Sequence, residues 1–147
     1  MIRPAVASDA PILSELLTQL GYPCSPAEIP ARLDAFARFP QAVALVATNG
    51  YGEVVGLITS HIISSIHDNE PVAWLTTLVV LEDARGAGIG SSLVEHVEKW
   101  ASQNGAKRLS VTSGIQREAT HAFYEKREYA RTGLRFSKRL DSQTARD

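Results

Sequence analysis

Cysteine is almost absent from this chain: Cys24 is the only one among 147 residues. A single cysteine excludes an internal disulfide and a zinc site built on cysteine ligands. No apolar run approaches the roughly 18 residues that a membrane span needs, and the first residues lack the apolar stretch of a secretory signal. We therefore expect a cytoplasmic protein that makes no membrane contact.

The chain also has little excess of either charge, with a net charge of −1 and 44% apolar residues. This is ordinary globular composition, and the length fits a single domain over residues 1–147, with residues 142–147 as a frayed tail. Basic residues gather at 107–139, where nine Lys or Arg face three Glu. Such a region can attract an anionic small molecule or a nucleic acid. Because no nucleic-acid motif accompanies it, we expect no nucleic-acid partner.

Apolar periodicity and capping residues predict two helices near the start of the chain. The first follows Ser8 or Asp9 and ends before Gly21, and the second opens with the capping box of residues 25–28 and ends near Arg38. Two strands follow at 42–48 and 53–60, joined by the turn Asn49-Gly50-Tyr51-Gly52. Residues 61–70 are expected to form the tail of the second strand and a loop.

The second half of the chain alternates strands and helices. The patterns predict strands at 72–80, 108–113 and 133–140, and helices at 91–103 and 117–126. The order is therefore ααββ-β-α-β-α-β, which indicates an α+β (mixed α/β) fold with helices on the faces of a mixed sheet.

A glycine-rich loop lies between the strand at 72–80 and the helix at 91–103. Its sequence is Arg85-Gly86-Ala87-Gly88-Ile89-Gly90. Backbone N–H groups at a helix start lack internal partners, the helix dipole is positive there, and glycine lets a phosphate approach closely. Arg85 adds a cation at the mouth of the loop. Although such a turn can also serve close packing alone, the combination favours binding of a diphosphate.

The spacing of the glycines excludes two common nucleotide sites. A dinucleotide fold needs Gly-x-Gly-x-x-Gly with an acidic residue about 20 positions later, whereas this loop has Gly-x-Gly-x-Gly and lies past mid-chain. The phosphate loop of nucleotide hydrolases needs Gly-Lys-Ser/Thr, which is missing. The four histidines are scattered without metal-ligand spacing, so we expect no metal site.

At this loop the chain resembles the GNAT superfamily of acetyl-CoA-dependent N-acetyltransferases. The family's loop, Gln/Arg-x-x-Gly-x-Gly/Ala, is matched by Arg85, Gly88 and Gly90. A second match is the segment at 119–126, which is similar to the family's later helix with its Phe-Tyr pair, here Phe123 and Tyr124. The start of the chain also looks like a common GNAT start. The resemblance covers nearly the whole chain and implies a GNAT-like central sheet, largely antiparallel, flanked by helices.

The resemblance also implies an activity and a site. The activity is direct transfer of an acetyl group from acetyl-CoA to a primary amine in a ternary complex. The strand at 78–80 would pair with the pantetheine arm and present a backbone N–H near Leu78 or Val79 to the thioester carbonyl, and Tyr124 would be the general acid toward the sulfur. The implied cofactor-binding residues are Leu78, Val79, Val80, Arg85, Gly86, Ala87, Gly88, Ile89, Gly90, Ser91 and Tyr124.

The chain departs from the family pattern at several positions. Many relatives carry Gly where this chain has Glu128, and some carry Asn where it has Arg117. Many also carry a Glu base on the central strand, where this chain has Trp74, Thr76 and Thr77. The general base is therefore open. Candidates before that strand are His61, His67 and Glu70, and a relayed water is an equal alternative.

The sequence leaves the acceptor open. Residues 21–40 and 60–70 would line its cleft, and acidic residues there could favour a cationic amine of a small molecule, the preferred interpretation. Alternatives are acetylation of a protein lysine or amino terminus, or a catalytically quiet CoA-binding sensor. Because this fold often dimerises through strand edges, we also expect a homodimer.

Overall fold

The computed structural model describes residues 1–113 and 117–141. It divides into two compact units, Met1–Val111 and Thr112–Asp147, each described here by itself. In the described ranges, no helix combines the length and apolar character needed to cross a membrane.

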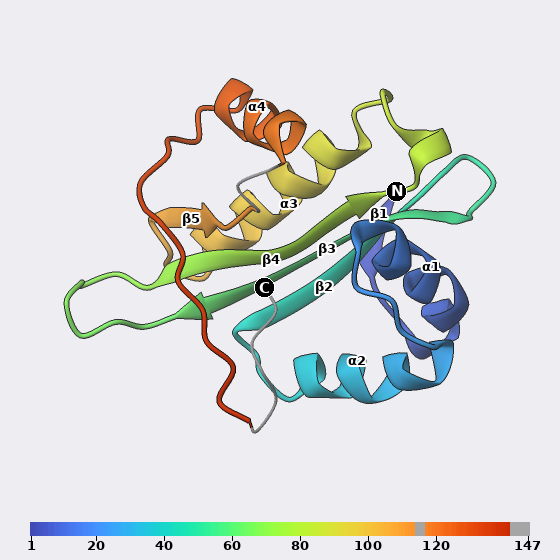
Figure 1. Cartoon of the computed structure of the whole chain (residues 1–147), viewed down its shortest axis with the longest axis horizontal. Coiled ribbons are helices and arrows are strands. Elements are labelled where there is room, and N and C mark those ends of the chain that lie inside the picture. The colour runs from blue at the N-terminus through green and yellow to red at the C-terminus, as the bar shows by residue number, and fades with distance from the viewer. Residues whose placement is uncertain (114–116, 142–147) are drawn as a thin grey trace. The chain divides into compact units, whose positions relative to one another are not determined.

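The first unit is built on a five-stranded sheet in the order β1-β2-β3-β4-β5 (Figure 1). Neighbouring strands from β1 to β4 are antiparallel, and β5 runs parallel to β4. The sheet is therefore mixed, as the order of predicted elements indicates, and largely antiparallel, as the GNAT resemblance implies. The strands are β1 Ile2–Pro4, β2 Ala42–Thr48, β3 Val54–Ile63, β4 Val72–Val80 and β5 Arg108–Val111.

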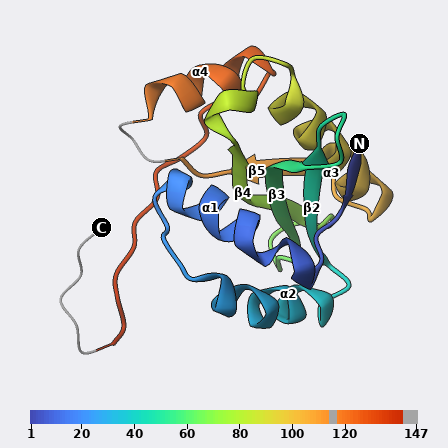
Figure 2. The same ribbon diagram turned by 90° about the vertical axis from the view of Figure 1, so that its right-hand side faces the viewer.

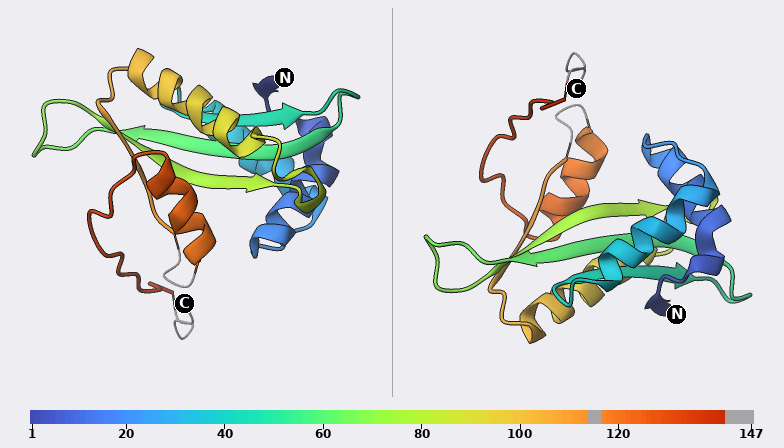
Figure 3. Two further views of the ribbon diagram at one scale, coloured as in Figure 1. Left: turned by 90° about the horizontal axis from the view of Figure 1, so that it is seen from above. Right: turned by 90° about the horizontal axis from the view of Figure 1, so that it is seen from below.

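Helices cover both faces of this sheet. Helices α1 (Ala10–Leu20) and α2 (Ile29–Ala37) lie on one face, and α3 (Ile89–Gln103) lies on the other (Figures 2 and 3). Short 3-10 turns at Ala7–Asp9, Pro26–Glu28 and Glu82–Ala84 precede the three helices. The first two turns fix where α1 and α2 begin against the sheet.

The predicted helix signals explain these ends. Gly21 ends α1 in the left-handed region at φ 107°, and its N–H bonds to the carbonyls of Leu17 and Thr18. Ser25 and Glu28 form the predicted capping box before α2, in which the Glu28 carboxylate accepts the Ser25 N–H at 2.8 Å. Both helices are therefore positioned by local chemistry that can be read from the sequence.

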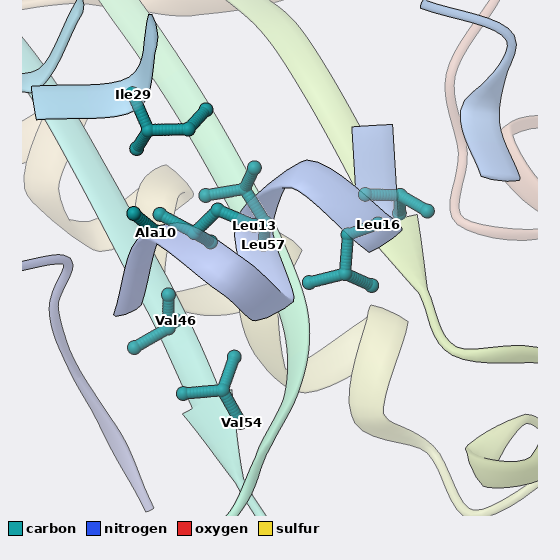
Figure 4. Packing of buried hydrophobic residues seen from close by; sticks show 8 residues of the cluster. Ala10, Leu13, Leu16, Ile29, Val46, Val54 and Leu57 are labelled. Carbon is teal, nitrogen blue, oxygen red and sulfur yellow. The ribbon is translucent and has the colours of Figure 1, made fainter. Parts of the chain in front are cut away.

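An apolar core joins α1 and α2 to the sheet. Figure 4 shows the side chains of Leu13 and Leu16 from α1 gathered with residues of β2 and β3, and Ile29 at the start of α2 beside them. Leu16 and Val46 are fully buried. Burying a side chain of this kind contributes about 1.5–3 kcal/mol. This core fixes the distance between the two helices and the sheet face that they cover.

The second unit contains α4 (Glu118–Lys126), which ends as a Schellman motif. The Tyr129 N–H bonds to the Tyr124 carbonyl, and the Glu128 N–H bonds to the Glu125 carbonyl, each at 3.0 Å. Glu128 takes φ 70°, the left-handed conformation that glycine favours. The motif at the end of α1 uses Gly21 in this role.

The structure corrects one predicted strand and adds another. Residues 133–140 are not a strand, and Leu134, Phe136 and Leu140 are exposed. Their alternation has the period of a strand, but a strand also needs backbone partners, which the pattern alone cannot supply. Strand β1 was not predicted; it is a three-residue edge strand whose Pro4 is tolerated because edge strands leave N–H groups unpaired.

Most other boundaries agree with the predictions. The strands at 42–48 and 72–80 are confirmed at both ends. Strand β3 continues to Ile63, so that His61 is a strand residue. Helix α3 begins two residues earlier than predicted, at Ile89, which places the last residues of the glycine-rich loop in its first turn.

Candidate active site

A β-bulge interrupts β4 near the middle of the sheet. Thr59 pairs with Thr77, and the next residue, Ser60, pairs with Leu75, so Thr76 is an extra residue without a partner on β3. A bulge bends its strand and increases the local twist. In the described chain, β5 pairs with β4 only as far as Leu75. The two parallel strands therefore stop pairing where the bulge begins.

Beyond the bulge, one side of β4 has no strand partner in the described residues. The N–H and C=O groups of successive residues point to opposite sides of a strand. The Leu81 N–H donates to the Val55 carbonyl of β3 at 2.8 Å. The backbone N–H and C=O of Val79, two residues earlier, therefore also face β3. The backbone N–H and C=O of Leu78 and Val80 face away from β3. The strand segment that the GNAT resemblance assigns to the cofactor thus offers both backbone groups of Leu78 and the N–H of Val80 on its open side.

The end of β4 is held by side chains. Gln19 of α1 donates to the Val80 carbonyl at 2.8 Å and accepts the Glu82 N–H at 3.1 Å. The Arg85 Nε also donates to the Val80 carbonyl, at 3.3 Å. Arg85 is thereby placed at the entrance of the glycine-rich loop by a contact to the strand that precedes it.

The loop itself has the backbone that an anion site requires. Gly86 and Gly88 have φ 87° and 79°, and a Cβ built on either would meet no atom within 4 Å. Gly88 caps α3, and its carbonyl accepts the Ser92 N–H at 3.0 Å. The N–H groups of the first helical turn, from Ile89 to Ser91, precede this first bond and lack helical partners. A phosphate could bind there because these N–H groups are not used by the helix and the space beside Gly86 and Gly88 is open.

A cavity of about 300 Å³ lies between the sheet and helices α1 and α2. Its volume is at the lower end of the range found for small-molecule sites. Most of its wall is apolar, and none of the described residues that line it is a carboxylate. The lining residues are Leu13, Leu17, Ile29, Arg32, Leu33, Phe36, Ala44, Leu57, Thr59, His61, Thr76 and Thr77.

Among the three base candidates, His61 lines this cavity. Its ring lies against Phe36 of α2, with the ring centroids 4.8 Å apart and an interplanar angle of 51°. On the neighbouring strand positions, the hydroxyls of Thr59 and Thr76 share a hydrogen bond of 2.7 Å. The His61 imidazole therefore lines the same cavity as Thr59 and the bulge residue Thr76.

His67 and Glu70 lie instead in the exposed loop between β3 and β4. The Ser65 hydroxyl and His67 Nδ1 are 2.6 Å apart, and the Glu70 N–H bonds to Asp68 at 3.4 Å. Asp68 also pairs with Arg108 of β5 at 3.5 Å. These contacts belong to the loop, and neither side chain lines the cavity.

In the second unit, Tyr124 is buried on α4. Its ring makes edge contacts with Phe123 and Tyr129, at centroid distances of 5.2 and 5.5 Å. Burial raises the pKa of Tyr124 from 10.0 to about 12. Its hydroxyl is protonated at neutral pH, as that of an ordinary tyrosine is. A proton is thus available at this oxygen, as a general acid requires.

Several cavity residues were not identified from the sequence. Arg32 and Phe36 are one turn apart on α2, a helix that was predicted only as part of a cleft-lining region. An i, i+4 pair on one helix face could have marked them as neighbours. Thr76 could not be identified as a bulge residue, because a bulge is a property of the register between two strands.

Comparison with known proteins places this geometry in a family. Residues 11–129 match the model of the acetyltransferase (GNAT) family. A candidate acetyltransferase from Agrobacterium tumefaciens str. C58 has a similar structure, with a TM-score of 0.84, 28% identity, and coverage of 95% of this chain and 99% of that chain.

Two curated enzymes are also similar. The aminoalkylphosphonate N-acetyltransferase of Salmonella typhimurium is 37% identical over 60% of this chain, and an aminoglycoside N(6')-acetyltransferase type 1 from Acinetobacter genomosp. 13 is 32% identical over 64%. The matches span 58% of the length of each of these relatives. The family model covers well over half of the chain and agrees with the predicted resemblance. This chain belongs to the GNAT family of acetyltransferases.

Proposed function

We propose that this protein is an N-acetyltransferase that moves an acetyl group from acetyl-CoA to a primary amine of a small molecule. The main support is the course of β4. The strand leads from the cavity at Thr76 and Thr77, past the open backbone groups of Leu78 and the open N–H of Val80, into the glycine-rich loop. One continuous segment therefore joins an acceptor site to a donor site.

The donor side would be held mainly by backbone groups. The N–H groups of residues 86–91 would bind the pyrophosphate of CoA, with Arg85 adding a positive charge. The Leu78 carbonyl and the Val80 N–H, on the open side of β4, would pair with the pantetheine arm as a neighbouring strand does. When bound, acetyl-CoA supplies the acetyl group as a thioester.

The acceptor amine would lie in the cavity with His61 as its base. An amine attacks through its lone pair, so its ammonium form must first lose a proton, and the His61 imidazole would accept it as general base. Holding amine and donor together lowers the entropic part of the barrier, which supports direct attack in a ternary complex. The apolar wall further favours the neutral amine, because burial disfavours charge.

Two groups would assist the departure of the thiol. The Leu78 N–H, on the open side of β4, would donate to the carbonyl oxygen as it gains negative charge. As the new C–N bond forms and the C–S bond breaks, Tyr124 would give its proton to the sulfur. The two related enzymes act, by name, on aminoalkylphosphonates and aminoglycosides, which supports a small-molecule acceptor over a protein.

The donor site is tested by calorimetric titration of acetyl-CoA into the wild type, Gly88→Glu and Gly52→Glu. Gly88→Glu should abolish micromolar binding because it puts a negative side chain in the loop. Gly52 is a matched control: it has φ 81° and open space around it, but lies in the β2–β3 turn. Absence of binding to the wild type would overturn the proposal, and loss in both variants would indicate a general effect of backbone strain.

The reaction is tested by following thiol release from acetyl-CoA with a panel of amines. The panel includes para-aminomethylbenzoate, a polyamine, an aminoglycoside and a lysine peptide. Turnover of a small amine supports the proposal, and turnover of the peptide alone would favour a protein acceptor. Binding of acetyl-CoA without turnover of any amine would favour a CoA-binding sensor.

A further inference from the structure

Among the described residues that line the acceptor cavity, Arg32 alone carries a permanent charge, and His61 is the other titratable group. Arg32 lies on α2, with its side chain 52% exposed. The cavity therefore combines an apolar interior with a cation that reaches solvent.

The acidic neighbour of Arg32 is held elsewhere. Glu28 lies one turn before it, and the closest approach of Arg32 Nη2 to Glu28 Oε2 is 4.0 Å, the outer limit for an ion pair. The same Glu28 oxygen accepts the Ser25 N–H at 2.8 Å in the capping box. A distance of 4.0 Å is too long for a hydrogen bond, so Glu28 leaves the donors of the Arg32 guanidinium able to bind a ligand.

Arg32 is also linked in space to the proposed base. Arg32 and Phe36 are four residues apart on α2, which puts them on the same helix face with about 5–6 Å between their Cβ atoms. Phe36 in turn contacts His61. The Arg32 guanidinium and the His61 imidazole therefore both line the cavity. Phe36 lies next to each of them, to Arg32 along α2 and to His61 through its ring.

We propose that Arg32 selects acceptors that carry an anionic group, and that the preferred substrate is a compact amine with an apolar body and a carboxylate or phosphonate at its far end. The guanidinium matches such anions with paired hydrogen bonds. The absence of a lining carboxylate among the described residues gives a polycationic amine no partner in the cavity, which disfavours aminoglycosides and polyamines. This inference deepens the proposed function and rests on the cavity being the acceptor site.

Two matched amines test the preference in turnover. Para-aminomethylbenzoate and para-aminomethylbenzamide share the amine and ring, and differ in whether the far end is charged. The wild type should acetylate the acid with a kcat/KM about tenfold higher than for the amide, as a hydrogen-bonded charge pair at a half-exposed site can supply. Arg32→Gln should remove the preference, Arg32→Lys should keep part of it, and Arg38→Gln should leave it unchanged. Arg38 is an exposed residue at the end of α2 that does not line the cavity.

Binding of acids without an amine tests the anion site independently of catalysis. Calorimetric titration with para-methylbenzoate should show binding that the neutral para-methylbenzamide lacks, and Arg32→Gln should abolish it. Equal behaviour of acid and amide, lack of binding by both, or a preference that survives in Arg32→Gln would overturn the inference. Amine turnover without an acid preference would refute this inference alone, whereas Arg32-dependent acid binding without any turnover would refute the proposed function alone.

Discussion

The imidazole of His61 on β3 lies against the ring of Phe36 on α2, with their centroids 4.8 Å apart. This contact connects the sheet to the helix that covers it at the proposed acceptor site. It also limits the directions in which the imidazole can turn, because the Phe36 ring occupies part of the space around it. Catalysis by a positioned base depends on such restraint.

Replacing His61 by Gln should lower kcat for the preferred amine by about a hundredfold, the size typical of a lost general base, with a smaller change in KM. Steady-state kinetics would measure both constants. His96→Gln is the matched control, since His96 is exposed on α3 and bonds to the Ser92 carbonyl of its own helix. If His67→Gln or Glu70→Gln lowered kcat and His61→Gln did not, the base would lie in the loop.

Replacing Tyr124 by Phe should lower kcat and leave acetyl-CoA binding nearly intact, because only the proposed proton donor is lost. With the pKa of Tyr124 raised to about 12, its ionisation should cause no loss of activity up to roughly pH 10. A pH–rate profile of both proteins measures this. Wild-type kcat in Tyr124→Phe would show that the hydroxyl is not the acid.

The same pKa shift predicts how stability changes at alkaline pH. The pKa of Tyr124 is 10.0 when the chain is unfolded and about 12 when it is folded. The contribution of Tyr124 to the free energy of unfolding is therefore fully present below its unfolded pKa of 10.0. It falls by up to about 2–3 kcal/mol as the pH rises to the folded pKa of about 12. Urea unfolding between about pH 9 and about pH 11 should show a shallower decline for Tyr124→Phe. Tyr51→Phe, at an exposed turn, should follow the wild type.

Arg3 and Asp9 form a salt bridge with two hydrogen bonds, which links β1 to the 3-10 turn before α1. The two Arg3 amino groups each donate to one Asp9 oxygen at 2.9 Å, and the Val6 N–H donates as well. The Arg3 hydrogen bonds lower the pKa of Asp9 below its usual 3.8 despite its burial. The contribution of this pair to the free energy of unfolding is therefore present above pH 3.8, the usual pKa of the carboxyl. It is lost as the pH falls through the lower pKa of folded Asp9.

Arg3→Gln should therefore lower the free energy of unfolding by about 1–2 kcal/mol at neutral pH, since it leaves a buried carboxylate without its cation. The difference from the wild type should shrink at acid pH. Urea denaturation at both pH values measures the effect. Arg139→Gln is the control, because its pair with Asp141 is exposed and should contribute little. An equal loss in both variants would contradict the prediction.

Glu128→Gly should stabilise the protein by about 1 kcal/mol, because glycine adopts φ 70° without the steric cost that a Cβ brings. Thermal denaturation would detect the gain as a higher Tm. Glu128→Ala serves as the control, since it removes the charge and keeps the Cβ. Equal stabilisation by both variants would assign the effect to charge.

The sequence predicted those parts of the fold that depend on local chemistry. The capping box at Ser25, the glycine stop at Gly21 and the turn at 49–52 all involve neighbouring residues, and each is confirmed. Residues 133–140 show the limit of such reasoning. Their alternating pattern is that of a strand, but a pattern cannot show whether a partner strand is present.

The candidate site likewise contains residues that could be identified from the sequence and residues that could not. Gly86 and Gly88 were identified because a phosphate loop has a local signature. Arg32 and Thr76 were not, because their roles depend on contacts between α2, β3 and β4 that are distant in the sequence. The predicted homodimer stays a prediction, and sedimentation at micromolar concentration is its test.

Glu128 has a consequence for how this protein could change over generations. The codons of glutamate and glycine can differ at a single base, so random mutation can reach Glu128→Gly in one step. A directed-evolution library under thermal selection should recover that substitution early. Because stability gained there can offset the cost of other changes, lineages that carry it should tolerate more variation in the proposed acceptor cavity, and changes in the proposed amine specificity should appear in them sooner.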